Sequence, residues 1–278
     1  MSFLSDLPRI KRPVVMGILN VTPDSFFDGG RYDSVDDAVA RAWRMVDEGA
    51  DIIDIGGEST RPGAEPIGPD EELARVMPVI ESLRGAGNVL ISIDTSTPEV
   101  MRQAANAGAN LINDVRALQR KGAMEAAADT GLPVCLMHMQ GDPSTMQQDP
   151  YYSDLLGEIR EFFEERIDAC RQAGIDRNRL ILDPGFGFGK TPAHNLQLLN
   201  RFARFKELGL PLLVGLSRKS TIGKILEGIS DDRLMGSVAG AVIAVTNGAS
   251  IVRTHDIKAT CEALQVTWAV MNEQLTEN

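Results

Sequence analysis

Apolar residues along this chain fall into short runs that alternate with longer segments of helical periodicity. Short apolar runs bounded by turn residues are typical of buried β-strands, and apolar positions that recur every three or four residues are typical of amphipathic helices. The runs predict strands at 14–20, 51–56, 89–95, 111–115, 133–139, 180–185, 212–217 and 251–255. Helices are predicted between them, among others at 35–48, 69–83, 98–107, 154–173 and 234–246.

This regular alternation predicts one parallel sheet with helices outside it. The strands are apolar on both faces, which is typical of parallel sheets covered by helices. Gly49, Gly108 and Gly248 directly precede predicted strands, as expected for glycines that end helices. Eight such units predict an α/β fold, a (β/α)8 TIM barrel, with a doubly wound sheet as the alternative. No linker or low-complexity stretch divides the chain, so we expect one domain over residues 1–278.

Charge and cysteine usage narrow the class of protein. The chain has 28 Lys and Arg against 39 Asp and Glu, a net charge of −11, which argues against nonspecific binding of nucleic acid. Cys135, Cys170 and Cys261 are far apart, which argues against a disulfide framework and a zinc site. The uncharged run 234–252 contains an Asn-Gly turn and reads as a helix followed by a strand, so no membrane span is expected. With no signal-peptide pattern, a cytoplasmic location is expected.

Candidate functional residues are the first polar residues after each apolar run, because active sites of (β/α)8 barrels form at the carboxyl ends of the strands. They are Asn20, Glu58, Ser59, Thr60, Arg61, Asp94, Asn113, Asp114, His138, Asp183, Ser217, Arg218, Lys219, Arg253 and His255. Arg61, Lys219, Arg253 and His255 follow three different strands and are predicted to converge on an anion. Asp94, Asn113 and Asp183 suit a heterocycle rich in N–H donors, or a positive charge. Such a site fits a substrate whose anionic leaving group departs from a nitrogenous ring.

Structural explanations compete with these roles. Asp94 is also placed to cap the following helix, and Asp183 to hold a turn before Gly185. Asp54 lies inside an apolar run and reads as a buried ion-pair partner, so it is left out of the candidate site. His138 reads as a core histidine, and His194 as part of a surface helix start. Their spacing contains no HExxH pattern, so a metal cage built by the protein alone is not expected.

The glycine-rich segment 185–191 resembles a phosphate-binding P-loop but lacks its first glycine, because Pro184 occupies that position. We therefore expect a flexible loop that shapes a ring pocket. Ser217-Arg218-Lys219 does not match the SxxK nucleophile pattern, and no catalytic triad follows from spacing alone. The loops at 22–32 and 59–69 are longer than usual βα connections and are predicted to act as lids.

Five segments, in order along nearly the whole chain, resemble the signatures of dihydropteroate synthases. They are MGILNVTPDSF at 16–26, GGESTRPG at 56–63, DPGFGFGK at 183–190, SRKS at 217–220 and RTHD at 253–256. Phe27 stands where that family commonly has serine. With no pterin-kinase segment ahead of these motifs, the resemblance is to the monofunctional bacterial type.

The resemblance implies a transferase that joins a dihydropterin hydroxymethyl diphosphate to p-aminobenzoate, with a dissociative pterin-cation mechanism and Mg²⁺ as cofactor. It implies catalytic roles for Asp94, Lys219 and Asn20, with Asn20 also holding the metal. The implied pterin-binding residues are Asp94, Asn113, Asp183, Lys219, Met137 and Gly187. The implied diphosphate-binding residues are Asn20, Arg61, Arg253 and His255. The implied p-aminobenzoate-binding residues are Phe26, Thr60, Pro62, Phe188 and Ser220.

The resemblance further implies small-molecule substrates and a homodimer, with no nucleic-acid or membrane partner. Two alternatives stay open. A methyltetrahydrofolate–corrinoid methyltransferase would share the pterin carboxylates but would not need Arg61, Arg253 and His255 around a diphosphate. A noncatalytic pterin-binding module would not need Asn20 for a metal.

Overall fold

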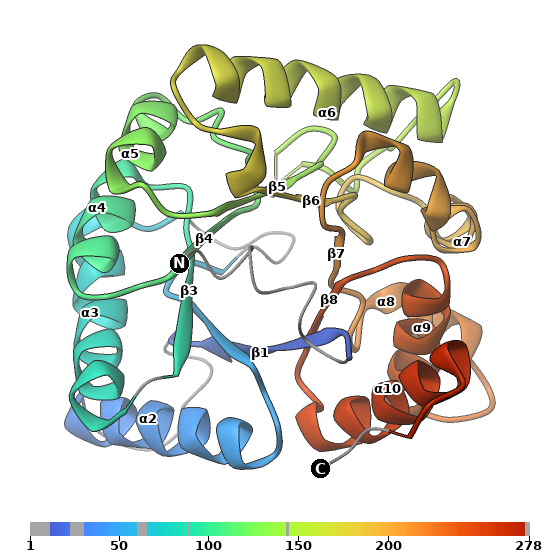
Figure 1. Cartoon of the computed structure of the whole chain (residues 1–278), viewed down its shortest axis with the longest axis horizontal. Coiled ribbons are helices and arrows are strands. Elements are labelled where there is room, and N and C mark those ends of the chain that lie inside the picture. Colours follow the sequence, from blue (N-terminus) through green and yellow to red (C-terminus); the bar gives the residue numbers. More distant parts are fainter. Residues whose placement is uncertain (1–11, 23–30, 60–65, 88, 143–144, 276–278) are drawn as a thin grey trace.

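The structure is a computed structural model that describes residues 12–22, 31–59, 66–87, 89–142 and 145–275. Its centre is a ring of parallel strands enclosed by helices (Figure 1). The strands are β1 (Val14–Asn20), β2 (Ile52–Gly56), β3 (Leu90–Asp94), β4 (Leu111–Asp114), β5 (Val134–Met137), β6 (Leu180–Asp183), β7 (Leu213–Val214) and β8 (Ile251–Thr254).

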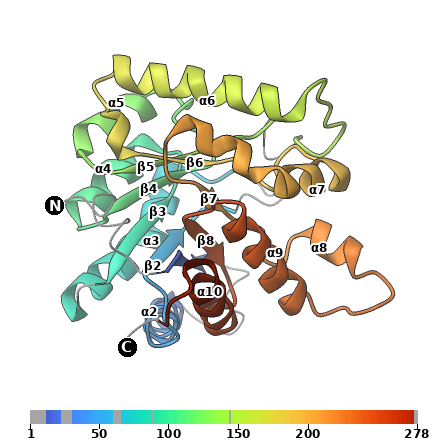
Figure 2. The same ribbon diagram turned by 45° about the vertical axis from the view of Figure 1, so that its right-hand side comes forward.

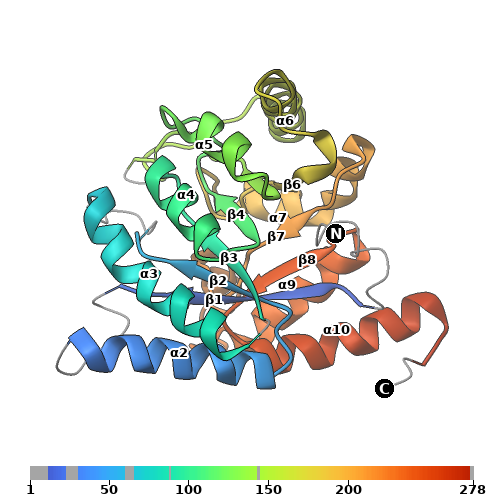
Figure 3. The same ribbon diagram turned by 60° about the vertical axis from the view of Figure 1, so that its left-hand side comes forward.

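The helices follow the strands in alternation. They are α2 (Arg31–Asp47), α3 (Pro69–Ala86), α4 (Pro98–Asn106), α5 (Ala123–Thr130), α6 (Leu155–Gln172), α7 (Pro192–Asn200), α8 (Ser220–Ile225), α9 (Leu234–Thr246) and α10 (Ile257–Asn272), with short 3-10 helices at Arg177–Arg179 and Phe202–Leu208. Figure 2 shows α9 and α10 together near β8, and Figure 3 shows α2, α3 and α4 along the outside of β1 to β3. In the described part of the chain, no helix combines the length and apolar character needed to cross a membrane.

The strand order distinguishes a barrel from a doubly wound sheet. Neighbouring strands pair in the order β6-β5-β4-β3-β2-β1-β8-β7, all in parallel. The two ends of this order meet through a parallel bridge between Leu182 and Leu212, and the Leu182 N–H donates to Pro211 O at 3.0 Å. The expected (β/α)8 barrel is confirmed, and the doubly wound alternative is wrong.

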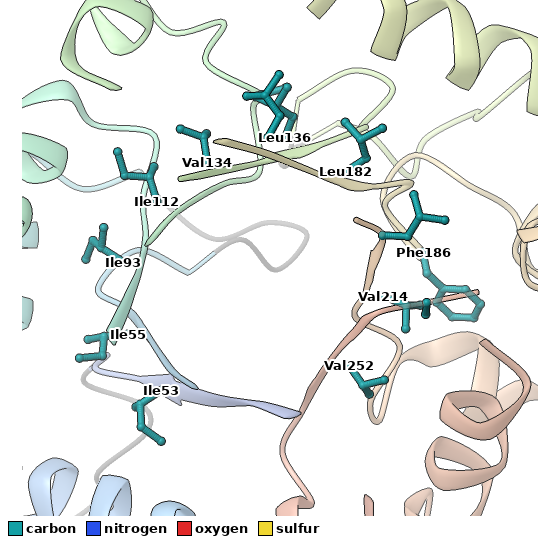
Figure 4. Packing of buried hydrophobic residues seen from close by; sticks show 14 of the residues in the cluster. Ile53, Ile55, Ile93, Ile112, Val134, Leu136, Leu182, Phe186, Val214 and Val252 are labelled. Carbon is teal, nitrogen blue, oxygen red and sulfur yellow. The ribbon is translucent and has the colours of Figure 1, made fainter. Parts of the chain in front are cut away.

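Side chains along each strand alternate between two apolar layers. One set points outward and packs under the helices, as Ile53, Ile93 and Val252 do in Figure 4. The other set forms a separate cluster that fills the barrel interior with Val14, Met16, Ile52, Leu111, Cys135, Ile181, Leu213 and Ile251. Because strand side chains alternate with a period of two, the residue two positions after each interior residue also points into the barrel. The polar residues at the ends of the strands therefore point into the barrel.

Most predicted elements are confirmed, with small shifts at their ends. All eight predicted runs contain a strand, but most strands are shorter than the run at one or both ends. β7 shrinks most, to Leu213–Val214 within the run 212–217. The helix start expected near His194 is confirmed by α7, where the Thr191 hydroxyl accepts from the His194 N–H at 3.1 Å. The loops predicted as lids, at 22–32 and 59–69, lie mostly outside the described residues.

The outward apolar layer predicts where truncation destabilises the barrel. Ile93 is fully buried, so Ile93→Ala is expected to lower the free energy of unfolding by about 2–5 kcal/mol. Ile229 is 78% exposed, so the same change there is expected to cost less than about 0.5 kcal/mol. Chemical denaturation of both variants checks this difference. Equal losses at the two positions would contradict the assignment of Ile93 to the core.

Candidate active site

At the carboxyl ends of the strands, most side chains on the interior face of the barrel are polar. The interior positions that follow the apolar layer are Asn20 on β1, Asp54 on β2, Asp94 on β3, Asn113 on β4, Met137 on β5, Asp183 on β6 and Arg253 on β8. Met137 lies in register with Asp183, and Asp94 with Asn113. Residues far apart in the sequence therefore meet at one barrel mouth because the strands are parallel and in register.

Arg253 links two carboxylates across the barrel. Its Nε donates to Asp54 Oδ2 at 2.6 Å, and its Nη2 donates to Asp94 Oδ2 at 2.7 Å. Asp54 Oδ2 also accepts from the Asn113 amide at 3.1 Å. Gly56 helps to leave room for Asp94, since a Cβ at Gly56 would lie 3.4 Å from the Asp94 Cβ. The result is one buried network that connects β8, β2, β3 and β4.

The network raises the pKa values of both Asp94 and Arg253, for different reasons. Burial raises the pKa of Asp94 to about 7; Arg253 opposes this shift, and the nearby Asp54 carboxylate adds to it. Burial lowers the pKa of Arg253, but Asp54 and Asp94 more than offset that effect and raise it overall. Arg253 therefore stays charged, whereas Asp94 changes charge near neutral pH.

Asp183 and Lys219 form the opposite side of the mouth. Asp183 Oδ1 accepts from the Gly185 N–H at 2.8 Å, so the carboxylate holds the turn as expected. Burial raises its pKa, and Lys219 opposes that shift. Lys219 donates to Phe186 O and lies 4.4 Å from the centre of the Phe188 ring. Burial lowers the pKa of Lys219 to about 8, against the opposing effect of Asp183.

Gly187 is required by the path of the Lys219 side chain. It has a φ of +85°, and a Cβ there would lie 2.9 Å from Lys219 Cδ. A larger residue would meet both backbone strain and a steric clash. Gly187 therefore lies directly beside Lys219, and the two residues border the mouth together.

The glycine-rich loop, which the sequence predicted to be flexible, makes many contacts with its surroundings in the structure. Lys190 is buried, and its Nζ bonds both Phe188 O and His138 Nδ1 at 3.0 Å. The Tyr152 hydroxyl donates to Gly189 O at 2.8 Å, and Asn195 accepts from the Gly187 N–H at 2.8 Å. Burial lowers the pKa of His138 to about 2, so His138 is the neutral core histidine that the sequence indicated. These bonds fix Phe186 and Phe188 against Lys219.

A second group of polar residues lines an open hollow of about 580 Å³ beside the barrel mouth. Asn20, Arg41, Arg218, His255 and Asp256 are among its lining residues. His255 Nδ1 lies 3.1 Å from Ser217 Oγ, and Arg218 pairs with Asp256 at 2.9 Å. Burial lowers the pKa of His255 to about 4, and Arg253 and Arg218 add to the shift. His255 is therefore neutral at pH 7 in the free protein, although the sequence grouped it with the basic residues.

The structure brings together many of the predicted site residues. Asp94, Asn113 and Arg253 belong to the network, while Asp183, Lys219, Gly187 and Phe188 lie around the glycine-rich loop. Met137 is buried beside Asp183, Asn20 and His255 line the hollow, and Ser220 is exposed at the start of α8. Phe26, Thr60, Arg61 and Pro62 lie outside the described residues. The capping role that competed for Asp94 is wrong, because Thr97 precedes α4 and Asp94 pairs with Arg253.

Sequence reasoning left out two residues that the structure places at the site. Asp54 is the buried ion-pair partner that its surroundings indicated, yet that pairing joins it directly to Arg253 and Asn113. Its position two residues before Gly56, on the interior face, is the signal that would have found it. Lys190, the last residue of the DPGFGFGK segment, carries no comparable signal because its partner His138 lies on another loop.

The residues present suit Mg²⁺ carried by an anionic substrate. Among the described residues, no three His, Cys, Asp or Glu side chains gather as a protein-built metal site. Mg²⁺ commonly takes one or two protein oxygens together with waters and substrate phosphates. The Asn20 amide at the end of β1, beside His255 and Arg218 in the hollow, provides such an oxygen.

Comparisons with known proteins identify the family. The sequence pattern of the pterin binding enzyme family matches residues 16–255. The dihydropteroate synthase of Escherichia coli K12 is 56% identical, over 95% of this chain and 93% of its own length. The Yersinia pestis dihydropteroate synthase, solved with a sulfonamide drug complex, superposes with a TM-score of 0.90 at 55% identity and covers 96% of both chains.

A Xanthomonas albilineans dihydropteroate synthase with 4-aminobenzoic acid gives a TM-score of 0.88 at 52% identity and covers 94% of this chain and 93% of that one. The same enzyme solved with 7,8-dihydropteroate gives 0.84 at 50% identity, with 94% of both chains covered. Identity at this level over nearly the full length of both chains, together with the family pattern, establishes the relationship. The chain belongs to the dihydropteroate synthase family of pterin-binding transferases.

Proposed function

We propose that this chain transfers the dihydropterin methyl group from dihydropterin hydroxymethyl diphosphate to p-aminobenzoate and releases diphosphate. The observation that carries the proposal is one barrel mouth where the acceptors Asp94, Asn113 and Asp183 meet the cations Arg253 and Lys219. Acceptors suit a ring edge rich in N–H groups, and cations suit a departing anion. The Xanthomonas complexes with 4-aminobenzoic acid and 7,8-dihydropteroate support the same substrates.

The pterin ring would lie between the two sides of the mouth. Asp94, Asn113 and Asp183 would accept hydrogen bonds from it, and Lys219 would donate to it. Met137 and Gly187 would border the ring, since Met137 is buried beside Asp183 and Gly187 contacts Lys219. The aromatic ring of Phe188, held over Lys219, extends this wall toward the p-aminobenzoate site.

The diphosphate would lie toward the hollow, where Asn20 and His255 are found. Arg253 uses two N–H groups on Asp54 and Asp94. A guanidinium has five N–H donors, so three remain for an anion. His255 would accept a proton more readily once an anion is bound beside it. Arg61 completes this set in the proposal, and Asn20 would hold Mg²⁺, which would supply charge neutralisation of the diphosphate.

The reaction in this proposal begins with cleavage of the bond between the pterin methyl carbon and the diphosphate oxygen. The bonding electron pair leaves with diphosphate, and a pterin methyl cation remains. Asp94, when ionised, stabilises the cation, because a fixed charge acts on charge that develops in the transition state. The p-aminobenzoate nitrogen then attacks the methyl carbon and releases a proton. No covalent bond to the protein is required.

The p-aminobenzoate would lie outside the pterin, near Phe188 and Ser220. Ser220 is exposed where α8 begins, directly after Lys219. Phe26, Thr60 and Pro62 complete this group in the proposal. A site open to solvent on this side allows the second substrate to arrive after the pterin diphosphate.

We also infer that the chain works as a homodimer in the cytoplasm. Exposed apolar side chains on α9 and α10, among them Met235, Ile243, Val266 and Val270, support an interface with a second copy. Cys135, Cys170 and Cys261 are free thiols, which agrees with a reducing compartment.

The proposed activity predicts release of diphosphate and formation of dihydropteroate when both substrates and Mg²⁺ are mixed with the protein. Omitting p-aminobenzoate or Mg²⁺ is expected to suppress product formation. Chromatography of the products measures both outcomes. Methyl transfer from a methylated tetrahydrofolate would instead favour the corrinoid methyltransferase, and pterin binding without any turnover would favour the noncatalytic module.

Asp94→Asn is expected to slow the chemical step by about a hundredfold to a thousandfold, while affinity for the pterin diphosphate changes much less. The reason is that the carboxylate opposes a positive charge that exists only near the transition state. Single-turnover kinetics separates the two quantities. Asp129→Asn, at a carboxylate whose side chain is 65% exposed on α5, is the matched control and should leave both unchanged. A collapse of binding with an unchanged rate would make Asp94 a recognition residue only.

The pKa values of Asp94 and Lys219 predict a narrow pH optimum for kcat/KM. Asp94 must be ionised, so activity should fall as the pH drops below about 7. Lys219 must be protonated to donate, so activity should fall as the pH rises above about 8. Asp94→Asn should abolish the acidic limb and keep the alkaline one. A flat profile from about pH 6 to about pH 9 would contradict these roles.

A further inference from the structure

Asp54 is the most enclosed charged residue of the barrel mouth. Its side chain is fully buried on β2, one interior position below Gly56. Its Oδ2 accepts from both Arg253 Nε at 2.6 Å and Asn113 Nδ2 at 3.1 Å. Its Oδ1 has no hydrogen-bond partner among the described residues. A buried carboxylate costs free energy unless it is paired, and the Arg253 contact supplies that pairing and fixes its position.

The hydrogen bond to Asp54 determines how the Asn113 amide is oriented. Asp54 Oδ2 is the acceptor, so the NH2 group of Asn113 points toward Asp54. A flipped amide would place two oxygen atoms against each other in a buried site, which is unfavourable. The Asn113 carbonyl oxygen therefore points the other way.

The Asn113 carbonyl oxygen stays available to a ligand. Within the described part of the chain, the enclosed side-chain atoms without a partner are Asp54 Oδ1, Glu72 Oε1 and Ser92 Oγ, and the Asn113 oxygen is not one of them. The one side-chain hydrogen bond of Asn113 to a described residue is the bond from its NH2 group to Asp54, and the residue is 5% exposed. An acceptor without a partner among the described residues can take a donor from the ligand.

We propose that Asp54 is a positioning residue that sets the Asn113 amide with its oxygen toward the pocket, so that the site selects ring edges carrying N–H donors. This inference rests on the proposed function, because it concerns recognition of the same pterin ring. Asp94 and Asp183 also present acceptors, and Lys219 presents a donor. An orientation of Asn113 with its NH2 group outward would break this pattern at one position and set that donor against an N–H donor of the ligand.

Removal of the Asp54 acceptor tests the proposal. In Asp54→Leu, no atom at position 54 accepts from the Asn113 NH2 group, which can then turn toward the pocket. In Asp54→Asn, the amide oxygen at the position of Oδ2 can still accept from both Arg253 and Asn113, so the orientation of Asn113 should be kept.

Calorimetric titration with bare pterin gives the readout. Asp54→Leu is expected to bind pterin roughly tenfold to a hundredfold more weakly than the original protein, and Asp54→Asn to keep most of the affinity. The contrast between these two side chains of similar size separates loss of the acceptor from a change in packing. Ser92→Ala is the matched control, because Ser92 lies in register with Asp54 and its buried hydroxyl has no partner among the described residues. It should leave pterin affinity unchanged.

The outcomes separate this inference from the proposed function. If the original protein does not bind pterin, the proposed function fails. If it does and Asp54→Leu binds as well, or Asp54→Asn binds no better than Asp54→Leu while the Tm of both is maintained, the role of Asp54 is wrong. A test on the original protein needs no variant: lumazine, which has an oxo group in place of the exocyclic amine, should bind at least roughly tenfold more weakly than pterin. Equal affinities would also overturn the inference.

Discussion

The guanidinium of Arg253 joins β8 to Asp54 on β2 and Asp94 on β3, and the geometry of the barrel mouth depends on this pairing. Removal of one partner of a buried ion pair leaves an uncompensated charge, which commonly costs about 3–5 kcal/mol. Two carboxylates share one cation here, so the group as a whole favours additional N–H donors and positive charge. The same excess of negative charge, added to burial, raises the pKa of Asp94 to about 7.

This arrangement explains how one barrel mouth can bind both a ring that becomes positively charged and an anion that departs. On one side, the acceptors face a ring that carries N–H groups and that becomes a cation during the proposed reaction. On the other side lies the hollow with Asn20, Arg218 and His255, where an anion would be released in the proposed reaction. Separation of charge is easier when each developing charge already faces its complement. The hydrogen-bonded loop from Gly185 to Lys190 fixes the third side of the mouth by holding Phe188 over Lys219.

The sequence predicts the barrel well because its signals are local and repeated. A period of two within short apolar runs indicates strands, and parallel pairing brings their polar ends to one mouth. Specific contacts were less predictable, because they depend on how the barrel closes. Asp54 in an apolar run looks like any buried ion-pair residue until β8 is placed beside β1. The neutral state of His255 depends on burial and on the nearby charges of Arg253 and Arg218. The spacing of residues in the sequence does not reveal these surroundings.

The central claim is that a pterin ring binds among Asp94, Asn113, Asp183 and Lys219, with its N–H edge toward the acceptors. The most direct measurement is a crystal structure of the protein with bound pterin. The account predicts ring N–H groups within about 2.7–3.2 Å of the Asn113 carbonyl oxygen and the Asp183 carboxylate. A ring bound elsewhere, or one that presents a lone pair to the Asn113 NH2 group, would contradict it.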